Sequence, residues 1–555
     1  MPVITIEHLK YKYPGTDWLA LNDISLTIEK GEFIGIAGRN GAGKSTLSQA
    51  IIGLVPQFYK GAYGGRVMVN EIVAEQMPVE QLCEHVGLIF QNPFNQLSGA
   101  KDTVYGEVGF GLQNLGIERE EMKRRIETVL KQLDIWQYRD RNPFDLSGGQ
   151  MQRVAIASVL VMQPEIIILD EPTSQLDPQG TEEVFRVVDQ LAESGITVIM
   201  IEQKLEKLAA YCDRVILMDD GRVVDFDTPE KIFSRDDLES LGVQAPAFTR
   251  IARKYGVKNA AGDYPVNLAD TVALFREKGI AVDAADGRHS TSVNAAAAAE
   301  NTVFSIQQLG FSYTKNVTIF EGLNLELDRR ATAIIGQNGA GKTTLVRLLK
   351  GLLKPSDGKI FYGMEDISKK TVAMLADKVG YVFQNPDDQI FKYKVLDEVM
   401  FGPLNIGMTE EQAEKEAKKA LELMGLAGKE AENPYDLELN ERKLVAIASV
   451  VAMDTDVIIL DEPTIAQDYL GRRLIGDMIR KLAGEGKLVI AILHDMDFVA
   501  ENFERILVMA HGKLLCDGTA DEVFAQTEIL EQARLQKPYM RELYDILSAE
   551  KEAEA

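Results

Sequence analysis

The sequence predicts an α/β protein built from two copies of one domain in tandem. Three segments of the first half of the 555-residue chain recur in the same order in the second half: GRNGAGKSTL as GQNGAGKTTL, GLIFQNPFNQ as GYVFQNPDDQ, and EIIILDEPTSQLD as DVIILDEPTIAQD. Late in the two copies, equivalent residues stand 291 positions apart. Constant spacing between ordered repeats indicates homologous domains rather than chance matches.

Each copy is expected to contain a mixed sheet core, a helical subdomain and a short C-terminal helical extension. In the first copy the short β-branched runs FIGIAG, EIIILD and ITVIMI predict strands. They alternate with RRIETVLKQL and TEEVFRVVDQLAE, which have the spacing of amphipathic helices. Runs that are apolar throughout, such as IIIL, predict strands covered on both faces of the sheet.

Composition divides the chain into four segments. We predict a first domain at residues 1–243, a helical extension and linker at 244–301, a second domain at 302–535 and a tail at 536–555. APAFTRIARKYGV and LADTVALFREKGI predict short helices, whereas RHSTSVNAAAAAEN is small and polar and predicts a flexible linker. The tail is again amphipathic after a proline, and its last residues are expected to fray.

Charge and cysteine content narrow the functional classes. The formal net charge of −25 argues against broad nucleic-acid binding, which needs a basic surface, and would suit a basic protein partner. Three widely separated cysteines predict neither a zinc site nor a disulfide framework. The first residues lack the apolar core of a signal peptide, and the apolar runs are too short to span a membrane. If the protein works at a membrane, other chains must do the spanning.

Each copy carries a P-loop, in which glycines let backbone N–H groups close around phosphates at the start of a helix. Both motifs follow an apolar strand and precede a helical pattern, which is the context that a P-loop requires. The lysine would reach the β- and γ-phosphates of ATP, and the following hydroxyl would hold Mg²⁺. The predicted nucleotide-binding residues are Gly38, Asn40, Gly41, Gly43, Lys44, Ser45 and Thr46 in the first copy and Gly336, Asn338, Gly339, Gly341, Lys342, Thr343 and Thr344 in the second.

A strand in each copy ends in two acidic residues, Asp170-Glu171 and Asp461-Glu462. Such a Walker B strand delivers its aspartate to the Mg²⁺ shell, and the adjacent glutamate sits where a general base could polarise the attacking water. With a P-loop upstream in both copies, these acids are predicted to be catalytic rather than simple strand ends.

Between the two motifs of the first copy stands LSGGQ, Leu146 to Gln150, and here the chain resembles the ATP-binding-cassette (ABC) ATPases along nearly its whole length. The resemblance implies that two cassettes pair head to tail, with each ATP between the P-loop of one and the signature of the other. It assigns Ser147, Gly148, Gly149 and Gln150 to nucleotide binding, Gln91 and Gln384 to the catalytic Q-loops, His494 to the catalytic switch position, and Tyr13 and Tyr313 to stacking on adenine. The expected Mg²⁺ ligands are Ser45, Gln91, Asp170, Thr343, Gln384 and Asp461. For the tyrosines, a role as edge-strand aromatics remains open.

FQNPFNQ and FQNPDDQ are similar to segments of the ATPase subunits of energy-coupling-factor (ECF) importers, for which a fused tandem form is known. This resemblance implies a peripheral position on the cytoplasmic face of the membrane, a transmembrane coupling protein and a small membrane substrate-binding protein as partners, and a vitamin, vitamin precursor or transition metal as cargo. In that family, helices bearing arginine enter the groove after the Q-loop. Asp387, Asp388, Glu107 and Glu398 could supply its acidic side, or could be a solvated helix face.

Three departures from the family pattern distinguish the copies. DLSGGQMQRVAIAS becomes DLELNERKLVAIAS, with Glu438 and Leu439 where a serine and a glycine would approach the γ-phosphate. A carboxylate at that position repels the phosphate, and the leucine adds bulk. Gln203 stands where the second copy has His494, and glutamine lacks the protonation states of imidazole. Ser174 becomes Ile465 in the loop expected at the cassette interface.

Head-to-tail pairing would gather all three departures in one ATP site. That site would join the first P-loop and Gln203 to the second copy's ELNE segment, while the other would join the second P-loop, Glu462 and His494 to LSGGQ. The sequence therefore predicts one hydrolysing site and one degenerate site. Independent drift is the alternative, although both copies keep both Walker motifs.

Two other functions stay open. A soluble tandem ATPase acting on ribosomes or nucleic acid would usually carry a long charged linker, an iron–sulfur cysteine cluster or long coiled coils, which this sequence lacks. ATPases of sugar importers typically degrade the second P-loop, and those of peptide importers usually keep both signatures. The transported compound is not encoded here, because another chain selects it in this family.

Overall fold

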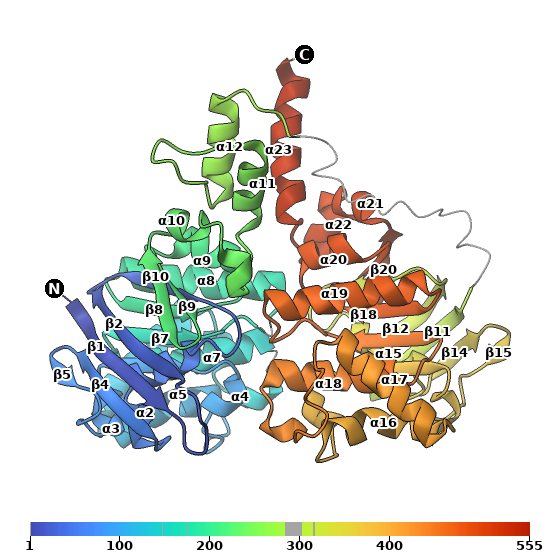
Figure 1. Ribbon diagram of the computed structural model, residues 1–555, viewed down its shortest axis with the longest axis horizontal. Coiled ribbons are helices and arrows are strands. Elements are labelled where there is room, and N and C mark those ends of the chain that lie inside the picture. Colours follow the sequence, from blue (N-terminus) through green and yellow to red (C-terminus); the bar gives the residue numbers. More distant parts are fainter. Residues whose placement is uncertain (1, 147, 175, 283–301, 315–316, 555) are drawn as a thin grey trace. The chain divides into compact units, whose positions relative to one another are not determined.

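The computed structural model describes residues 2–146, 148–174, 176–282, 302–314 and 317–554. The chain forms two compact units, Met1–Ile280 (unit 1) and Ala281–Ala555 (unit 2), which Figure 1 colours from blue to green and from yellow to red. Ser147 and the predicted linker RHSTSVNAAAAAEN lie outside the described residues. The finer division of the chain into four segments stays a prediction.

Unit 1 contains two sheets. A four-stranded antiparallel sheet has the order β2-β1-β4-β5, and a six-stranded sheet has the order β10-β9-β3-β8-β7-β6. The second sheet is mixed, because β6, β7, β8, β3 and β9 are parallel and only β10 is antiparallel. The strands of unit 1 are β1 Pro2–Lys12, β2 Leu21–Glu29, β3 Phe33–Ala37, β4 Ala62–Val69, β5 Ile72–Val73, β6 Val86–Ile89, β7 Ile166–Asp170, β8 Thr197–Ile201, β9 Arg214–Asp219 and β10 Arg222–Asp227.

The helices of unit 1 connect these strands, and α4 to α7 form the predicted helical subdomain. They are α1 Lys44–Ile51, α2 Leu54–Gln57, α3 Val79–Leu82, α4 Pro93–Gln96, α5 Val104–Asn114, α6 Arg119–Gln132, α7 Gly148–Leu160, α8 Pro178–Glu193, α9 Leu205–Tyr211, α10 Pro229–Phe233, α11 Ala247–Tyr255 and α12 Leu268–Glu277. The short helices predicted after the first domain are α11 and α12.

Unit 2 repeats the same two sheets in the same order, β12-β11-β14-β15 and β16-β17-β18-β13-β19-β20. Its strands are β11 Phe304–Thr314, β12 Val317–Leu327, β13 Thr332–Ile335, β14 Asp357–Tyr362, β15 Glu365–Asp366, β16 Val379–Val382, β17 Val457–Asp461, β18 Leu488–Ile492, β19 Arg505–Ala510 and β20 Lys513–Gly518. The shared strand order confirms that the repeats in the sequence are structural repeats.

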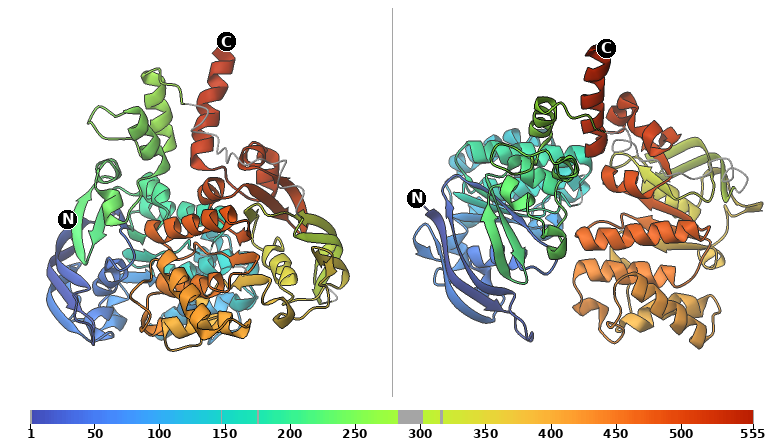
Figure 2. Two further views of the ribbon diagram at one scale, coloured as in Figure 1. Left: turned by 45° about the vertical axis from the view of Figure 1, so that its right-hand side comes forward. Right: turned by 45° about the horizontal axis from the view of Figure 1, so that its top comes forward.

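The helices of unit 2 include a helical subdomain of α16 to α18, drawn in orange in Figure 2. They are α15 Lys342–Leu349, α16 Val395–Asn405, α17 Glu410–Leu423, α18 Leu439–Val451, α19 Tyr469–Gly484, α20 Met496–Asn502, α21 Ala520–Phe524, α22 Thr527–Gln532 and α23 Tyr539–Glu554. The C-terminal tail thus forms helix α23, which is anchored where the backbone N–H of Tyr539 donates to Asp497.

The central strands are buried on both faces, as their apolar sequences predict. Every residue of β8, β17 and β18 is buried, and helices of the same unit contribute to the cores on each side. Parallel strands place their carboxyl ends at one edge of the sheet, where loops gather functional groups. Both Walker B strands and both P-loop strands end at this edge.

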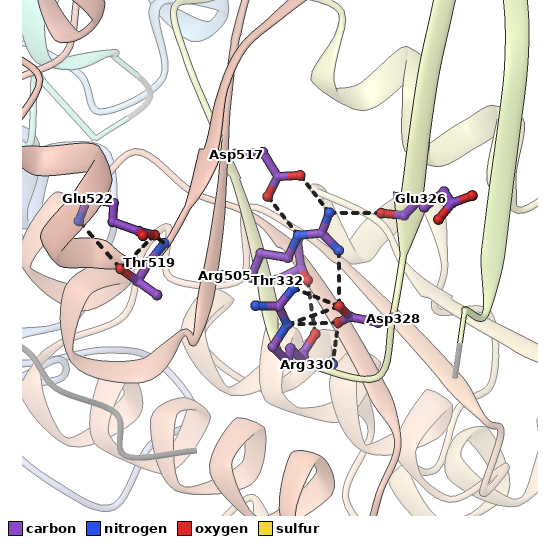
Figure 3. Close-up of polar contacts among 8 residues, drawn as sticks. All are labelled: Glu326, Asp328, Arg330, Thr332, Arg505, Asp517, Thr519 and Glu522. Carbon is purple, nitrogen blue, oxygen red and sulfur yellow. Dashed lines mark hydrogen bonds and ion pairs between the residues drawn. The ribbon is translucent and has the colours of Figure 1, made fainter. Parts of the chain in front are cut away.

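An ion-pair network centred on the buried Arg505 joins the two sheets of unit 2 (Figure 3). Arg505 of β19 donates from Nε and Nη2 to the two carboxylate oxygens of Asp517 on β20, at 2.8 and 2.6 Å, and from Nη2 to the carbonyl of Glu326 on β12, at 2.8 Å. Its Nη1 also lies 3.5 Å from Asp328, which Arg330 engages through Nε and Nη2. The guanidinium groups hold the pKa of Asp328 below its usual range against the opposing effect of burial.

Candidate active sites

The two P-loops form cradles of the same shape at the sheet edge. In unit 1 Lys44 is buried, and its Nζ donates to the carbonyls of Gly38 and Arg39, each at 2.8 Å. In unit 2 Lys342 donates to Gly336 and Gln337, at 2.6 and 3.0 Å. An ammonium group held over the loop is placed to meet incoming phosphates.

Glycine is required where each loop crosses the end of a neighbouring strand. Gly38 and Gly336 have φ angles of 153° and 146°, and a Cβ atom on either would collide with the carbonyl of Met218 or Met509. Only glycine combines this conformation with such a close approach. The other P-loop residues predicted to bind nucleotide follow on the same loops and on the first turns of α1 and α15.

The predicted Mg²⁺ ligands lie together in each unit. The Ser45 hydroxyl bonds to Asp170, and Thr343 Oγ1 lies 3.4 Å from Asp461 Oδ1. Burial raises the pKa of both aspartates, against the lowering effect of the hydrogen bonds from Ser45 to Asp170 and from Tyr381 to Asp461. Carboxylate and hydroxyl oxygens are hard ligands that suit Mg²⁺, so the residues present fit the metal.

Each Walker B glutamate is held between two side chains. Gln91 Nε2 donates to Glu171 Oε2 at 2.7 Å, and Gln384 Nε2 donates to Glu462 Oε2 at 2.8 Å. Both glutamates have a left-handed backbone, with φ of 46° and 52°. Non-glycine residues adopt this strained conformation mainly where the surroundings enforce it, often at functional sites.

The second oxygen of each glutamate faces the switch position, where the units differ. His494 Nε2 lies 2.9 Å from Glu462 Oε1, whereas Gln203 Nε2 donates to Glu171 Oε1 at 2.8 Å and to Asn40 Oδ1 at 3.0 Å. Burial alone would raise the pKa of Glu462, but the His494 imidazole, assisted by nearby lysines, holds that pKa below its usual range. An ionised carboxylate is the form that a general base needs.

The tyrosines assigned to adenine sit beside the P-loops. The Tyr13 hydroxyl lies 3.2 Å from Thr46 Oγ1 and donates to Gln49 at 3.0 Å, and the Tyr313 hydroxyl lies 3.1 Å from Thr344 Oγ1. The Tyr313 side chain is half exposed and therefore accessible to a base.

The two signature segments begin the same helix with different side chains. Gly148 is the first residue of α7, and Leu439, which is partly exposed, is the first residue of α18. Glu438 immediately precedes α18. Glu441, the last residue of the altered ELNE segment, lies within α18 and forms an ion pair with Lys429 at 2.6 Å. The altered segment is therefore a well-formed helix start and not a disrupted one.

The loop that follows each Q-loop glutamine is closed by the other polar residues of its motif. Asn92 and Asn385 cap the next turn, and the Oε1 atoms of Gln96 and Gln389 accept from the backbone N–H groups of Phe90 and Phe383. The residue pattern FQNPxxQ thus shapes the loop, which explains why both units keep it.

The proposed acidic surface beside this loop needs correction. Glu107 and Glu398 are buried: Glu107 accepts from the backbone N–H and hydroxyl of Ser98, and Glu398 accepts from the backbone N–H groups of Phe391 and Lys392. Their charges serve the loop and do not face a partner. Asp387 and Asp388 are exposed, and Asp387 pairs with Arg442 at 2.9 Å.

Three residues near these sites have no counterpart among the sequence predictions. Tyr381 donates to Asp461 at 2.7 Å, buried Lys443 donates to the carbonyls of Gln384 and Glu462, and buried Glu202 accepts from Thr173. All three differ between the copies, where leucine, glutamine and leucine stand in their places. The difference between the two copies is the feature of the sequence that could have identified these three residues.

Comparison with known proteins agrees with this geometry. Residues 21–174 and 320–465 match the ABC transporter family. The chain belongs to the ABC transporter family. This ABC protein carries two ABC domains in tandem with the P-loop NTPase fold, binds ATP and is an ATPase.

Relatives of this ABC ATPase span nearly its whole length. It is 41% identical over 548 residues to a "Putative ABC transporter ATP-binding protein" of Methanosarcina acetivorans, covering 97% of this chain and 89% of the relative. It is 36% identical over 543 residues to a similarly named protein of Caldanaerobacter subterraneus, covering 96% and 94%. A solved structure of cbiO1 from Clostridium perfringens, described as part of the ABC transporter complex cbiONQ, matches with 33% identity, 46% of this chain, 99% of that chain and a TM-score of 0.39. Among the described residues of the ABC protein, no helix has the length and apolar content needed to cross a membrane.

Proposed function

We propose that this ABC ATPase is the motor subunit of an ECF-type importer for a vitamin, a vitamin precursor or a transition metal. In this proposal the site built on the P-loop of unit 2 hydrolyses ATP. The site built on the P-loop of unit 1 binds ATP and turns over slowly or not at all. The observation that carries the asymmetry is the switch position, where His494 faces one catalytic glutamate and Gln203 faces the other.

In unit 2, Glu462 is the general base for the attacking water. Its carboxylate is ionised, is oriented by Gln384 on one oxygen, and faces His494 on the other. An imidazole N–H donates a hydrogen bond, so His494 can stabilise negative charge that develops beside the γ-phosphate. The ring nitrogen proposed to act is Nε2, which already faces Glu462.

The metal fits the oxygen atoms that the two units provide. Thr343 and Asp461 would hold Mg²⁺ in unit 2, and Ser45 and Asp170 would hold it in unit 1. Because the Gln384 amide nitrogen is bonded to Glu462, its oxygen is the atom left for the metal, and the same holds for Gln91. When bound, Mg²⁺ would neutralise negative charge on the β- and γ-phosphates.

Unit 1 retains the base but lacks the imidazole. The Gln203 amide donates to both Glu171 and Asn40, so it orients the carboxylate but cannot exchange a proton with it. If the cassettes pair head to tail, as the family resemblance implies, this site would also receive Glu438 and Leu439 in place of the serine and glycine of a signature. A carboxylate close to a phosphate costs several kcal/mol in a partly dry site, on the order that Coulomb's law gives at low effective dielectric.

The importer class rests on the Q-loop segments FQNPFNQ and FQNPDDQ and on the exposed groups beside them. Phe94 and Phe144 stack in unit 1 with ring centroids 6.0 Å apart, and Phe391 and Phe401 meet edge to face in unit 2 at 4.6 Å. All four rings are substantially exposed. Exposed aromatic pairs suit a protein–protein contact, and we assign them to a transmembrane coupling protein that would hold the ATPase at the cytoplasmic face of the membrane. A separate small membrane protein would select the cargo.

Paired glutamate variants test the asymmetry. Glu462→Gln keeps the size of the side chain but removes the base, and should lower the kcat for ATP by about a hundredfold or more. Glu171→Gln makes the same chemical change in unit 1 and should lower kcat by less than about twofold. Steady-state ATP hydrolysis by the full-length protein gives both values.

Each variant serves as the control for the other, because both replace a glutamate carboxylate with an amide of nearly the same size. Retained binding of a fluorescent ATP analogue would show that both variants remain folded. Equal loss of kcat in the two variants would contradict the assignment of hydrolysis to unit 2.

A further inference from the structure

Lys443 is a buried cation at the junction of three functional segments of unit 2. It lies in the first turns of α18, the helix that follows the altered signature, and its side chain is only 2% exposed. Its Nζ donates to the carbonyl of Gln384 at 3.0 Å and to the carbonyl of Glu462. One ammonium group thereby links the signature helix, the Q-loop and the end of the Walker B strand.

These contacts close a ring around the catalytic carboxylate. The side chains of Gln384 and Glu462 are already joined by the 2.8 Å hydrogen bond from Nε2 to Oε2. Lys443 joins the backbones of the same two residues from the other side. With both backbone and side chain tied, neither residue can shift without breaking a hydrogen bond to a buried charged group, which is among the stronger kinds.

The backbone of Glu462 is strained, like that of Glu171. Its φ of 52° lies in the left-handed region, which costs a residue with a side chain on the order of 1 to 3 kcal/mol. In unit 2 the carbonyl of this strained residue also accepts the hydrogen bond from Lys443. The positive charge also lies close enough to Glu462 and Asp461 to favour their ionised forms.

Burial of the ammonium group has a measurable electrostatic consequence. It lowers the pKa of Lys443 to about 8, against the raising effect of Glu462 and Asp461. A lysine in an apolar position without such contacts would be unfavourable, since isolated buried charges are costly. Its position is therefore explained by the two carbonyls that it holds and the carboxylates that it faces.

Unit 1 lacks this link. The equivalent residue is Gln152, which is equally buried, and its Nε2 has no hydrogen-bond partner among the described residues. The Gln91–Glu171 hydrogen bond nevertheless forms at 2.7 Å. Glutamine is shorter than lysine and is neutral, and among the described residues the Gln152 amide nitrogen donates to neither the Q-loop nor the Walker B carbonyl.

We propose that Lys443 is a positioning residue for ATP hydrolysis in unit 2, holding the Q-loop and Glu462 in one arrangement so that movement of the signature helix reaches the general base directly. This inference rests on the proposed function, which makes Glu462 the base that turns over. It adds a second asymmetry between the units, at a residue outside the four that replace the signature.

The test compares Lys443→Met and Lys443→Gln with the unchanged full-length protein in steady-state ATP hydrolysis. Methionine keeps the length and apolar stem of lysine but removes the charge and the donors. Misplacement of a catalytic group by about 1 Å can cost about a hundredfold, so kcat should fall by about tenfold to a hundredfold, while KM for ATP changes by less than about twofold. Lys443→Gln should lose as much as Lys443→Met, because the glutamine of unit 1 reaches no partner at this position.

Two matched variants separate positioning from general stability. Lys350→Met removes another buried lysine of unit 2, which donates to the carbonyl of Val379, and burial also lowers the pKa of this lysine to about 8. Gln152→Met alters the equivalent buried position of unit 1. Both should keep kcat within about twofold of the unchanged protein.

The outcomes are decisive. Unchanged kcat in Lys443→Met, a rise in KM without a fall in kcat, or an equal loss in Lys350→Met would each overturn the positioning role. If Glu462→Gln abolishes turnover while Lys443→Met does not, this inference alone fails. If Glu462→Gln and Glu171→Gln lose equally, the proposed function fails instead.

Discussion

Glu202 shows how one residue can change the chemistry of a switch region. It precedes Gln203 and is fully buried, whereas the equivalent residue of unit 2 is Leu493. Its Oε1 accepts from the backbone N–H and hydroxyl of Thr173, and its Oε2 accepts from the backbone N–H of Gln203. Unit 1 therefore ties its switch segment to the segment after Walker B with a carboxylate, a link that the apolar Leu493 side chain cannot form.

Because the Glu202 carboxylate is buried, we expect it to make the free energy of unfolding depend on pH. Burial raises the pKa of Glu202, Lys204 and the Thr173 hydrogen bonds oppose that rise, and the Glu171 charge adds to it. A raised pKa in the folded state means that stability is full below the ordinary glutamate pKa of about 4.3 and declines as pH rises through the raised value. Glu202→Gln removes this term, so the free energy of unfolding of the variant minus that of the unchanged protein should increase as pH rises above about 4.3, by at most about 1.4 kcal/mol per pH unit.

Urea unfolding followed by tryptophan fluorescence measures this difference in unit 1. The sequence has two tryptophans, Trp18 and Trp136, and both belong to that unit. A stability difference that stays constant with pH would show that Glu202 is charged at no extra cost in the folded state.

Residues of this kind mark the limit of prediction from sequence. Lys44, Asp170, Glu462 and His494 could be predicted because each stands in a motif whose spacing defines its function. Lys443 could not, since the sequence does not state that its helix buries that face against two backbone carbonyls. Glu107 was misassigned for the opposite reason: its position beside the Q-loop was visible, but its burial was not.

At the level of helices and strands, the sequence predicts the elements that have a regular apolar spacing, but it does not predict the junctions that depend on tertiary contacts. Strands β3, β7 and β8 and helices α6 and α8 follow from apolar spacing, and the structure confirms them. The junction of β12, β19 and β20 does not follow from spacing, because it depends on the Arg505 network shown in Figure 3. In unit 1 the equivalent arginine, Arg214, makes a cation–π contact instead of this ion pair. Its guanidinium carbon lies 3.5 Å from the ring centroid of Phe226, which is the residue equivalent to Asp517.

This difference predicts unequal costs for one substitution. Arg505→Met removes the hydrogen bonds to the exposed Asp517 and the 3.5 Å contact with Asp328, which keeps Arg330, and hydrogen bonds to charged groups contribute about 1.5 to 3 kcal/mol. Arg214→Met loses a cation–π contact worth about 0.5 to 2 kcal/mol and a longer contact with Glu32. Hydrogen exchange of the β19–β20 and β9–β10 peptides at increasing urea concentrations would report each free energy of unfolding in the full chain.

A comparable loss in both units would contradict this prediction. It would indicate that water replaces the lost ion pairs of unit 2 at little cost. The stabilisation would then come from packing of the apolar arginine stem, which both units share.

At the scale of the whole molecule, duplication made the fold predictable. Two P-loops and two Walker B strands in register fix the class of each unit, and the strand order of unit 2 repeats that of unit 1. Duplication also makes the sequence differences between the units visible, because each residue of one copy can be compared with its equivalent in the other. Assembly with membrane proteins depends on surfaces and on other chains, and follows from neither periodicity nor motif spacing.

The exposed aromatic pair of unit 2 provides the test of that assembly. Phe391 and Phe401 meet edge to face at 4.6 Å beside the Q-loop, and Lys392 lies over both rings. If a transmembrane coupling protein docks here, Phe391→Ala with Phe401→Ala removes the central contact area, and aromatic contacts of this kind often cost about 2 kcal/mol or more when truncated. Recovery of the coupling protein and of a small membrane substrate-binding protein from solubilised membranes should then fall by about tenfold or more, while binding of an ATP analogue persists.

Met364→Ala is the matched control, because Met364 is fully exposed in the turn between β14 and β15 and should leave recovery unchanged. Recovery of ribosomes would favour a soluble ATPase, and recovery of a membrane pair without the small substrate-binding protein would favour another importer class, because only an ECF importer combines a shared coupling protein with a separate cargo-selecting subunit.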